Sequence, residues 1–416
     1  MITIPFIYFS LLSLFCYHKH RQIDLATIIS LMFAVSGFFS ILVDVNNLRY
    51  DDTYSYEISG IPVIVYLFLL TICILPISKC YVLNKFQLKQ IHNLNILKII
   101  SFIVLFWFVS STFLARNDIM RVLFGDMADI RRDLYAGVSS NSWMSSLPGP
   151  IRFVYACLNF IFGCPWTLIF MGFYCLVSTK VKKYHSYIFF LASLSGPING
   201  IIGADRSQVA YWMISLFLLY WMFKPHIPLK IRKRLYLYGL MIIGCLVIYL
   251  SLMTISRFGD RDARGGSWGS LISYFGQPFI NFCYFFDEYN LPFQHWGILF
   301  PFISQYIFGI KAGGVVIQEQ MSLLSGKFTG VFYTFMGHFI IALGQVWAVV
   351  IVLFYSSLSH IFFRKVQRLK VISINHVFLS YAMISVVGLG IFTYYYAVVG
   401  NALGVLLMYI IIKKLK

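Results

Sequence analysis

Long apolar runs without charged residues are the feature that most constrains how this chain can fold. The stretch 235–256, for example, holds no Asp, Glu, Lys or Arg. A helix needs roughly 20 apolar residues to cross the hydrocarbon core of a bilayer. Only 12% of the 416 residues are charged, about half the share of a typical soluble domain. The sequence therefore predicts an all-α, polytopic membrane protein with one transmembrane domain, residues 1–416.

Eleven segments have the length and composition of a membrane-spanning helix. They are 3–17, 24–44, 60–78, 98–115, 151–178, 186–203, 208–223, 235–256, 334–357, 374–393 and 396–412. The fifth is long and contains Gly163 and Pro165, which predicts a kink or a re-entrant half-helix. The apolar stretch 296–310 is short, and we expect it at the membrane interface rather than across the membrane.

The first apolar segment is followed at once by His18, Lys19, His20 and Arg21. A cleavable signal has its positive charge before the apolar stretch, so we expect a retained helix with its N-terminus outside. Eleven spans then put the C-terminus in the cytoplasm. The inner loops of this topology hold 21 of the 33 Lys and Arg residues, and 14 of the 15 acidic residues lie outside. This distribution follows the positive-inside rule.

Lysine and arginine are distributed differently between the two sides. Inside there are 16 Lys and 5 Arg, whereas outside there are 2 Lys and 10 Arg, namely Arg49, Arg116, Arg121, Arg131, Arg132, Arg152, Arg206, Arg257, Arg261 and Arg264. Arginine is favoured where phosphate or carboxylate is held by two parallel hydrogen bonds. The outer face therefore fits an anionic headgroup. The alternative is Arg–Asp pairing that ties loops together.

Two outer loops are long enough to carry function. Residues 116–150 show helical periodicity and are expected to lie on the membrane as an amphipathic segment. Residues 257–333 form a large outer loop, far longer than an ordinary connection. No phosphate-binding loop, dinucleotide motif or Cys/His metal pattern occurs, so we expect no cofactor and no metal.

The large loop opens with a cluster of arginines. Arg257, Arg261 and Arg264 share one face if the preceding helix continues outward, and Asp260 lies near that face. Guanidinium groups this close repel one another unless an anion lies between them, which predicts anion binding; a solvated structural network is the alternative. Arg206 lies at a short outer turn, where it could meet a lipid phosphate or simply reach lipid headgroups in general.

Aromatic and amide residues alternate in the following segment. Tyr274, Gln277, Asn281 and Tyr284 combine rings that stack on sugars with groups that bind hydroxyls, although an interfacial aromatic belt has the same pattern. Asp260, Glu288 or His338 could accept a hydroxyl proton. A buried structural histidine is the alternative for His338.

At these residues the chain resembles the O-antigen polymerase (Wzy) family, the bacterial oligosaccharide repeat-unit polymerases. The resemblance rests on the layout of the spans, the turn 203–206, the arginine cluster, and the segments 274–286 and 328–337. Members often have Asp-Phe-Gly near the last segment, where this chain has Gly337-His338-Phe339. The resemblance implies a membrane glycosyltransferase architecture of the GT-C type in the bacterial inner membrane.

The resemblance also implies a reaction, the joining of undecaprenyl-diphosphate-linked repeat units into a surface polysaccharide. Arg206, Arg257, Arg261 and Arg264 would bind the diphosphate, and residues 274–286 would position the glycan. The implied partners are the lipid-linked oligosaccharides, membrane lipid and a chain-length regulator protein, and no nucleic acid. O-antigen ligase, which passes the glycan to lipid A core, is the alternative within this chemistry. A flippase and a membrane O-acetyltransferase are alternatives of other classes.

Overall fold

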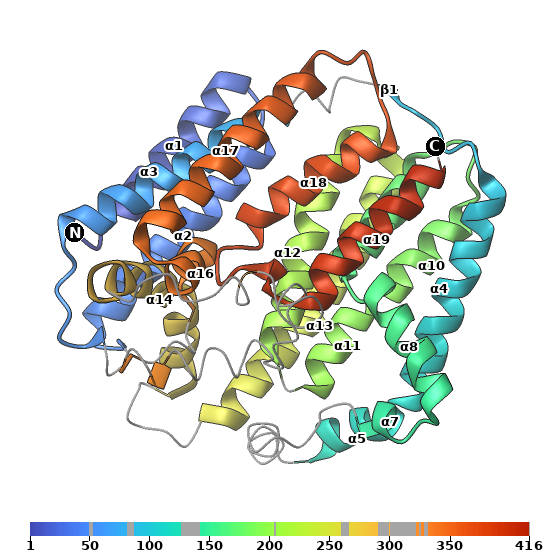
Figure 1. Cartoon of the computed structure of the whole chain (residues 1–416), viewed down its shortest axis with the longest axis horizontal. Coiled ribbons are helices and arrows are strands. Elements are labelled where there is room, and N and C mark those ends of the chain that lie inside the picture. Colours follow the sequence, from blue (N-terminus) through green and yellow to red (C-terminus); the bar gives the residue numbers. More distant parts are fainter. Residues whose placement is uncertain are drawn as a thin grey trace. The chain divides into compact units, whose positions relative to one another are not determined.

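The computed structural model is mostly helical and describes most of the chain (Figure 1). The described residues are 1–49, 53–80, 87–125, 142–203, 205–258, 266–289, 299, 322–323, 326–327 and 332–415. They divide into two compact units, each assembled from segments that lie far apart in the sequence. Unit 1 comprises Met1–Lys85, Arg261–Lys370 and Ser380–Val399, and unit 2 comprises Phe86–Asp260, Val371–Leu379 and Gly400–Lys416. The prediction of one transmembrane domain stays a prediction.

Unit 1 joins the N-terminal helices to helices from the second half of the chain. Its elements are α1 (Ile4–His20), α2 (Leu25–Val45), α3 (Gly60–Ile77), α14 (Gly266–Glu288), α16 (Thr334–Leu343), α17 (Gln345–Gln367), the end of α18 (Ile374–Gly388) and the short helix η6 (Tyr395–Ala397). α2 packs against α1 and α14, while α3 packs against α17. The rings of Phe9, Tyr66, Phe279 and Phe282 meet in its core.

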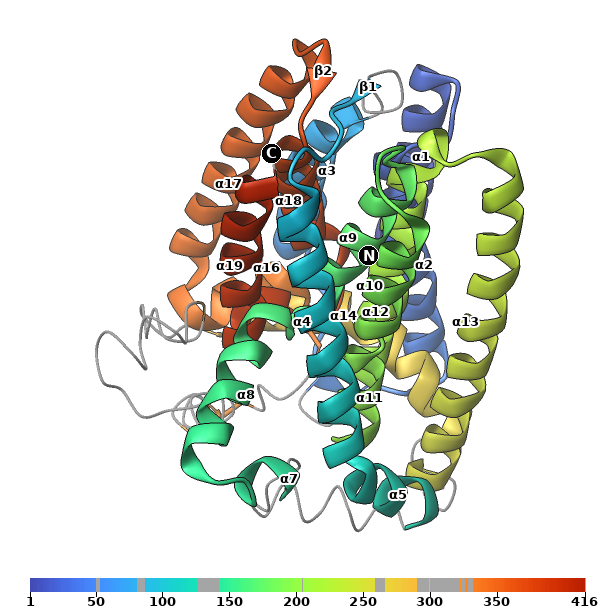
Figure 2. The same cartoon turned by 90° about the vertical axis from the view of Figure 1, so that its right-hand side faces the viewer.

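Unit 2 contains the middle of the chain and its last helix. Its elements are β1 (Gln87–Leu88), α4 (Leu94–Leu114), α5 (Arg116–Phe124), α7 (Ser142–Ser145), α8 (Gly149–Phe162), α9 (Pro165–Val177), α10 (Lys183–Ser193), α11 (Ser195–Ile202), α12 (Arg206–Phe223), η3 (Lys224–His226), α13 (Leu229–Phe258), β2 (Val371–Ile372), the start of α18, and α19 (Val399–Leu415). The almost fully buried α9 lies between α10 and α12, and α13 is one continuous helix (Figure 2). The strands pair in parallel, Gln87 with Val371 and Leu88 with Ile372.

Several helices are long and apolar enough to cross a membrane. Within the described ranges there are four, Leu25–Val45, Gly60–Cys80, Leu94–Leu114 and Gln345–Gln367, or five if the bent pair α8 and α9 counts as one span. Fewer helices therefore meet this description than the eleven spans expected, although each expected span is helical for most of its length. The pair bends by 62° at the Gly163–Pro165 break, the position where a kink or a re-entrant half-helix is predicted.

The structure differs from the sequence expectation at two segments. Residues 266–288, expected within the large outer loop, form the helix α14 inside unit 1. The expected span 334–357 is broken at Gly344, whose φ of 80° separates α16 from α17. The short stretch 296–310 and the middle of the expected amphipathic segment, 126–141, lie outside the described residues, except Leu299.

The crossing of α2 and α14 is very close. The Ser36 hydroxyl donates to the Phe275 carbonyl oxygen at 2.8 Å, and the Ser40 hydroxyl donates to the Gly276 carbonyl oxygen at 2.6 Å. Pro278 lies inside α14, where it has no N–H to donate and its ring crowds the preceding turn. The two serines therefore bind carbonyls of the turn that Pro278 disturbs. Small residues at such a crossing let two membrane helices approach closely.

Gly276 leaves no room for a side chain. A Cβ atom there would lie 2.4 Å from the Phe39 carbonyl oxygen, so we expect Gly276→Ala to push the two helices apart and cost about 1–3 kcal/mol of stability. At Gly239 in α13, a Cβ would meet nothing within 4 Å. Gly239→Ala is therefore a matched control that should change stability by at most about 1 kcal/mol. Thermal unfolding of the detergent-purified variants measures both, and equal melting temperatures would contradict the close crossing.

Candidate functional site

A cluster of polar side chains lies where α14 ends and α3 begins. The Tyr56 hydroxyl donates to Asp287 Oδ2 at 2.7 Å, and the Ser59 hydroxyl donates to the same oxygen at 2.8 Å. A carboxylate at the C-terminal end of a helix meets the negative end of the helix dipole, and these two donors offset that cost. Burial, and secondly the bond to Asp287, raises the pKa of Tyr56, so this hydroxyl stays protonated and keeps donating.

Three further side chains complete this polar cluster. Lys327 Nζ lies 3.6 Å from Glu288 Oε2 and 4.9 Å from the centre of the Tyr284 ring. The Tyr284 ring meets the Tyr56 ring edge-on, at 5.4 Å between centroids. The hydrogen bond with Tyr284 raises the pKa of Lys327; partial burial opposes this, and the charges of Tyr284 and Glu288 add to it. The cluster thus contains a cation, two carboxylates and two phenols.

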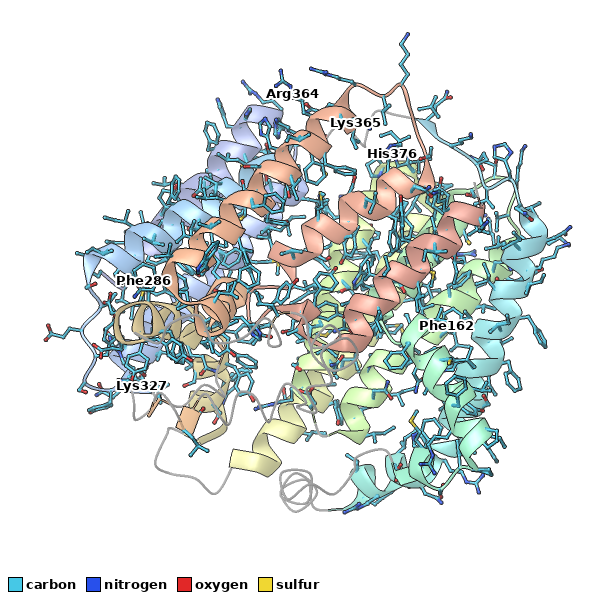
Figure 3. The ribbon with its side chains drawn as sticks, viewed as in Figure 1. Phe162, Phe286, Lys327, Arg364, Lys365 and His376 are labelled. Carbon is cyan, nitrogen blue, oxygen red and sulfur yellow. The ribbon has the colours of Figure 1, made fainter. Side chains whose placement is uncertain are left out.

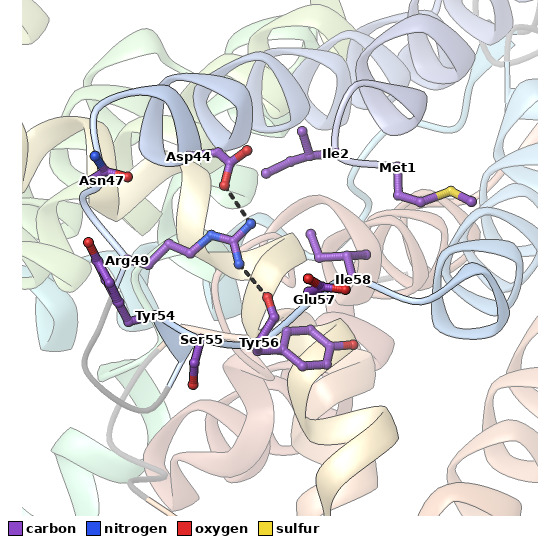
Figure 4. A pocket seen from close by; sticks show the side chains of 10 residues that line it. All are labelled: Met1, Ile2, Asp44, Asn47, Arg49, Tyr54, Ser55, Tyr56, Glu57 and Ile58. Carbon is purple, nitrogen blue, oxygen red and sulfur yellow. Dashed lines mark hydrogen bonds and ion pairs between the residues drawn. The ribbon is translucent and has the colours of Figure 1, made fainter.

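A pocket of about 540 Å³ adjoins this cluster (Figure 4). Its lining residues are Met1, Ile2, Asp44, Asn47, Arg49, Tyr54, Ser55, Tyr56, Glu57 and Ile58, and we call it the Arg49 pocket. Most of them belong to the connection between α2 and α3. This connection turns at Asn47, whose φ of 52° is one that asparagine tolerates better than most residues.

Arg49 is held in place from two sides. One terminal nitrogen forms an ion pair with Asp44 Oδ1 at 2.5 Å, and the other donates to the Tyr56 carbonyl oxygen at 2.6 Å and the Thr53 carbonyl oxygen at 3.4 Å. The buried Nε–H has no hydrogen-bond partner among the described residues. Among the arginines expected in outer loops, Arg49 therefore ties its own connection together through an Arg–Asp pair, which was the alternative to anion binding.

The residues expected to bind glycan all lie on α14, and three of them are buried. Asn281 is 1% exposed and donates to the Phe332 carbonyl oxygen at 2.7 Å, while Gln277 is 4% exposed and accepts from Asn281 at 3.5 Å. Tyr284 is buried in the polar cluster, and the Tyr274 ring contacts Phe332, at 5.0 Å between centroids. In this structure these side chains contact other parts of unit 1, and their binding of glycan stays a prediction.

His338 lies in the middle of α16 and is 4% exposed. Its ring is flanked by Tyr333 and Tyr394, at centroid distances of 5.8 and 6.0 Å. The start of α16 is fixed by three backbone bonds to another segment: Tyr333 N and Thr334 N donate to the Phe392 carbonyl oxygen at 3.0 and 2.9 Å, and Phe335 N donates to the Gly390 carbonyl oxygen at 2.8 Å. Thr334 has a φ of 63°, which is costly for a β-branched residue.

The expected diphosphate-binding residues belong to the other unit or lie outside the described residues. Arg206 is the first residue of α12, only 8% exposed, and follows the N-cap Asp205, which accepts a bond from Ser207 N at 2.9 Å. Arg257 belongs to the last turn of α13. Asp260, Arg261 and Arg264 lie outside the described residues. His338 and Glu288 are in unit 1, whereas Arg206 and Arg257 are in unit 2.

Sequence reasoning missed the Arg49 pocket, although a signal for it exists. The connection 46–59 is short, yet it holds one arginine, three acidic residues and three tyrosines.

Comparisons of the chain with protein-family models, with curated proteins and with solved structures find no match. In the described part of the chain, no three His, Cys, Asp or Glu side chains are grouped as ligands for a metal ion.

Asp287 and Glu288 are neighbours, and their hydrogen bonds predict that loss of the Asp287 carboxylate lowers stability more than loss of the Glu288 carboxylate. Asp287→Ala removes the acceptor of the half-buried Tyr56 hydroxyl, and we expect it to cost about 1–3 kcal/mol. Glu288→Ala removes only a half-exposed pair with Lys327, and such pairs contribute about 0–1 kcal/mol. Thermal unfolding of both variants in detergent is the measurement. A larger loss for Glu288→Ala would refute the role given to Asp287.

Proposed function

We propose that this chain polymerises undecaprenyl-diphosphate-linked oligosaccharide repeat units at the outer face of the bacterial inner membrane. The proposed topology has eleven spans, with the N-terminus outside and the C-terminus in the cytoplasm. The product is an O-antigen or a similar surface polysaccharide. Among the described residues, four helices, or five with the bent pair, have the length and apolarity of a membrane span, which supports the membrane setting of the proposal.

The observation that carries the proposal is the arrangement of charge along α13. This helix has 30 residues and rises about 45 Å, more than the roughly 30 Å of hydrocarbon core. Lys230, Arg232, Lys233 and Arg234 lie near its start, residues 235–256 are uncharged, and Arg257 lies in its last turn. A helix of this kind would display Arg257 beyond the lipid, and Arg261 and Arg264 follow it directly in the sequence.

The charges of unit 1 agree with the proposed orientation. The basic ends of three helices meet, because Lys79 Nζ lies 3.0 Å from His360 Nε2 and both α1 and α17 carry basic residues in their last turns. Figure 3 shows Arg364 and Lys365 at this end of α17, and Phe286 and Lys327 at the other end of unit 1. Asp44, Asp287 and Glu288 lie at that second end. Basic ends belong on the cytoplasmic side, which supports placing the polar cluster outside.

The proposed reaction is a glycosyl transfer between two lipid-linked glycans. A hydroxyl at the far end of a new repeat unit attacks the anomeric carbon of the growing chain. A new carbon–oxygen bond forms, the bond from that carbon to the diphosphate breaks, and undecaprenyl diphosphate leaves with the electron pair. The hydroxyl proton passes to a base, for which Asp260, Glu288 and His338 are the candidates. The donor carries its own activation, so no nucleotide is needed.

The arginines stabilise the leaving group in this proposal. Arg257, Arg261 and Arg264, together with Arg206, bind the diphosphate and stabilise the charge that grows on it as the bond breaks. Guanidinium groups suit this role because each can bind two phosphate oxygens in a fixed geometry. Tyr274, Gln277, Asn281 and Tyr284 remain the proposed positioning residues for the glycan.

Deletion of the gene tests the proposed function directly. We expect a mutant strain to lose long-chain polysaccharide and to keep lipid A core bearing a single repeat unit, as seen on a gel of surface polysaccharide. Core without any repeat unit would instead identify a ligase. Long chains of unchanged length distribution would refute both functions.

Replacing arginine by lysine tests the diphosphate contacts. Arg261→Lys and Arg264→Lys keep the charge but lose the paired hydrogen bonds, and we expect about a tenfold or greater loss of long-chain product. The control is Arg116→Lys, because Arg116 is exposed at the start of α5 and lies over the Phe113 ring. Immunoblots of the membrane fraction must show equal amounts of each variant. Normal chain lengths in both variants would exclude these two arginines from the mechanism.

A further inference from the structure

We propose that the Arg49 pocket binds a sugar ring of the lipid-linked glycan, an inference that rests on the proposed function. From the sequence, Arg49 is associated only with an anionic headgroup, together with the other outer arginines, and no sugar is assigned to this part of the chain. The pocket is large enough, because its volume of about 540 Å³ falls within the roughly 300–1,000 Å³ typical of small-molecule sites.

The lining of the pocket matches the chemistry of sugar hydroxyls. A hydroxyl both donates and accepts hydrogen bonds, so a sugar needs carboxylate or amide acceptors next to N–H donors. Asp44 and Glu57 supply carboxylates that accept, and Asn47 supplies an amide whose nitrogen donates and whose oxygen accepts. Tyr54 adds an aromatic ring that is 63% exposed.

Three of these side chains are free to bind a ligand. Asn47, Tyr54 and Glu57 form no side-chain hydrogen bond, ion pair or ring contact within the described part of the chain. Asp44 and Arg49, in contrast, hold each other in place. The pocket therefore combines a fixed wall with uncommitted polar groups, which is the arrangement that a preformed binding site requires.

The charge of the pocket decides against the diphosphate as its ligand. Its lining residues carry two carboxylates, on Asp44 and Glu57, one guanidinium, on Arg49, and the amino group of Met1. Arg49 is already paired with Asp44, and Glu57 balances the amino group in net charge, so the pocket has no excess positive charge to hold a diphosphate. A neutral ring with many hydroxyls needs no such charge.

The position of the pocket connects it to the polar cluster at the end of α14. Tyr56 lines the pocket, its ring contacts Tyr284, and its hydroxyl binds Asp287. Glu288, one of the candidate bases, follows Asp287 directly. A sugar held by the pocket would thus be bound next to the part of unit 1 in which sequence reasoning placed glycan contacts.

The test separates binding from catalysis in a purified system. The probe is the lipid-linked repeat unit extracted from the deletion strain, supplied to the purified chain in lipid nanodiscs. We expect Tyr54→Ala and Glu57→Gln each to raise KM about tenfold with little change in kcat, since a lost hydrogen bond to a charged group or a lost ring contact weakens ground state and transition state alike. Neither side chain supports the fold, so both variants should be as stable as the parent.

The matched control is Tyr187→Ala, because Tyr187 in α10 is 62% exposed, almost as much as Tyr54. This control should keep the parent KM. An unchanged KM in both pocket variants, or a fall in kcat at unchanged KM, would overturn the inference.

If the parent protein makes no polymer, the proposed function is refuted. A separate binding experiment then still tests whether the pocket binds sugar. Here the probe is the oligosaccharide released from the same lipid by mild acid, measured by native mass spectrometry. Binding that is lost in the Tyr54→Ala, Glu57→Gln double variant would support the sugar site. No binding to the parent, or retention of phosphatidylethanolamine that only the double variant loses, would overturn it.

Discussion

Two serine hydroxyls bonded to backbone carbonyls hold α2 and α14 together where these helices cross in unit 1. Ser36 and Ser40 lie one turn apart on α2 and bind the carbonyl oxygens of Phe275 and Gly276, where Pro278 disturbs the hydrogen bonding of α14. The missing side chain of Gly276 permits the approach. Within a membrane such bonds replace water for polar backbone groups. The position of α14, and with it the polar cluster at its C-terminal end, depends on this crossing.

The polar groups of unit 1 are segregated between its two ends. At one end, lysine, arginine and histidine of α1, α3 and α17 come together with little acidic compensation, the His20–Asp24 pair being the exception. At the other end, carboxylates are matched by hydroxyls and by single cations, as in Asp44 with Arg49 and Asp287 with Tyr56. The first pattern suits a membrane surface, and the proposed orientation places it on the cytoplasmic side. The second pattern suits recognition of a ligand with many hydroxyls.

Hydropathy was enough to predict the helical nature of the chain, because lipid-facing helices need long apolar runs. Gly163 and Pro165 were enough to predict the bend, because proline disturbs a regular helix. Hydropathy could not predict that α14 packs inside unit 1. The amides of Gln277 and Asn281 look like surface groups in the sequence, but both are buried, because Asn281 donates to the Phe332 carbonyl oxygen and to Gln277. The Arg49 pocket was missed for a related reason, since its lining comes from a connection that turns back on itself.

The start of α16 and the end of α18 in unit 1 depend on each other. α16 has 10 residues and rises about 15 Å, half the thickness of the hydrocarbon core. The N–H groups of Tyr333, Thr334 and Phe335 are satisfied by carbonyls of Phe392 and Gly390, in the segment where α18 has ended. If α18 continued as a regular helix past these carbonyls, its own N–H groups would occupy them. The N–H groups at the start of α16 would then be unsatisfied and away from water. Substitutions in one of these two segments are therefore constrained by the other. The irregular backbone after α18 provides the hydrogen-bond acceptors that a preceding helical turn would provide for α16.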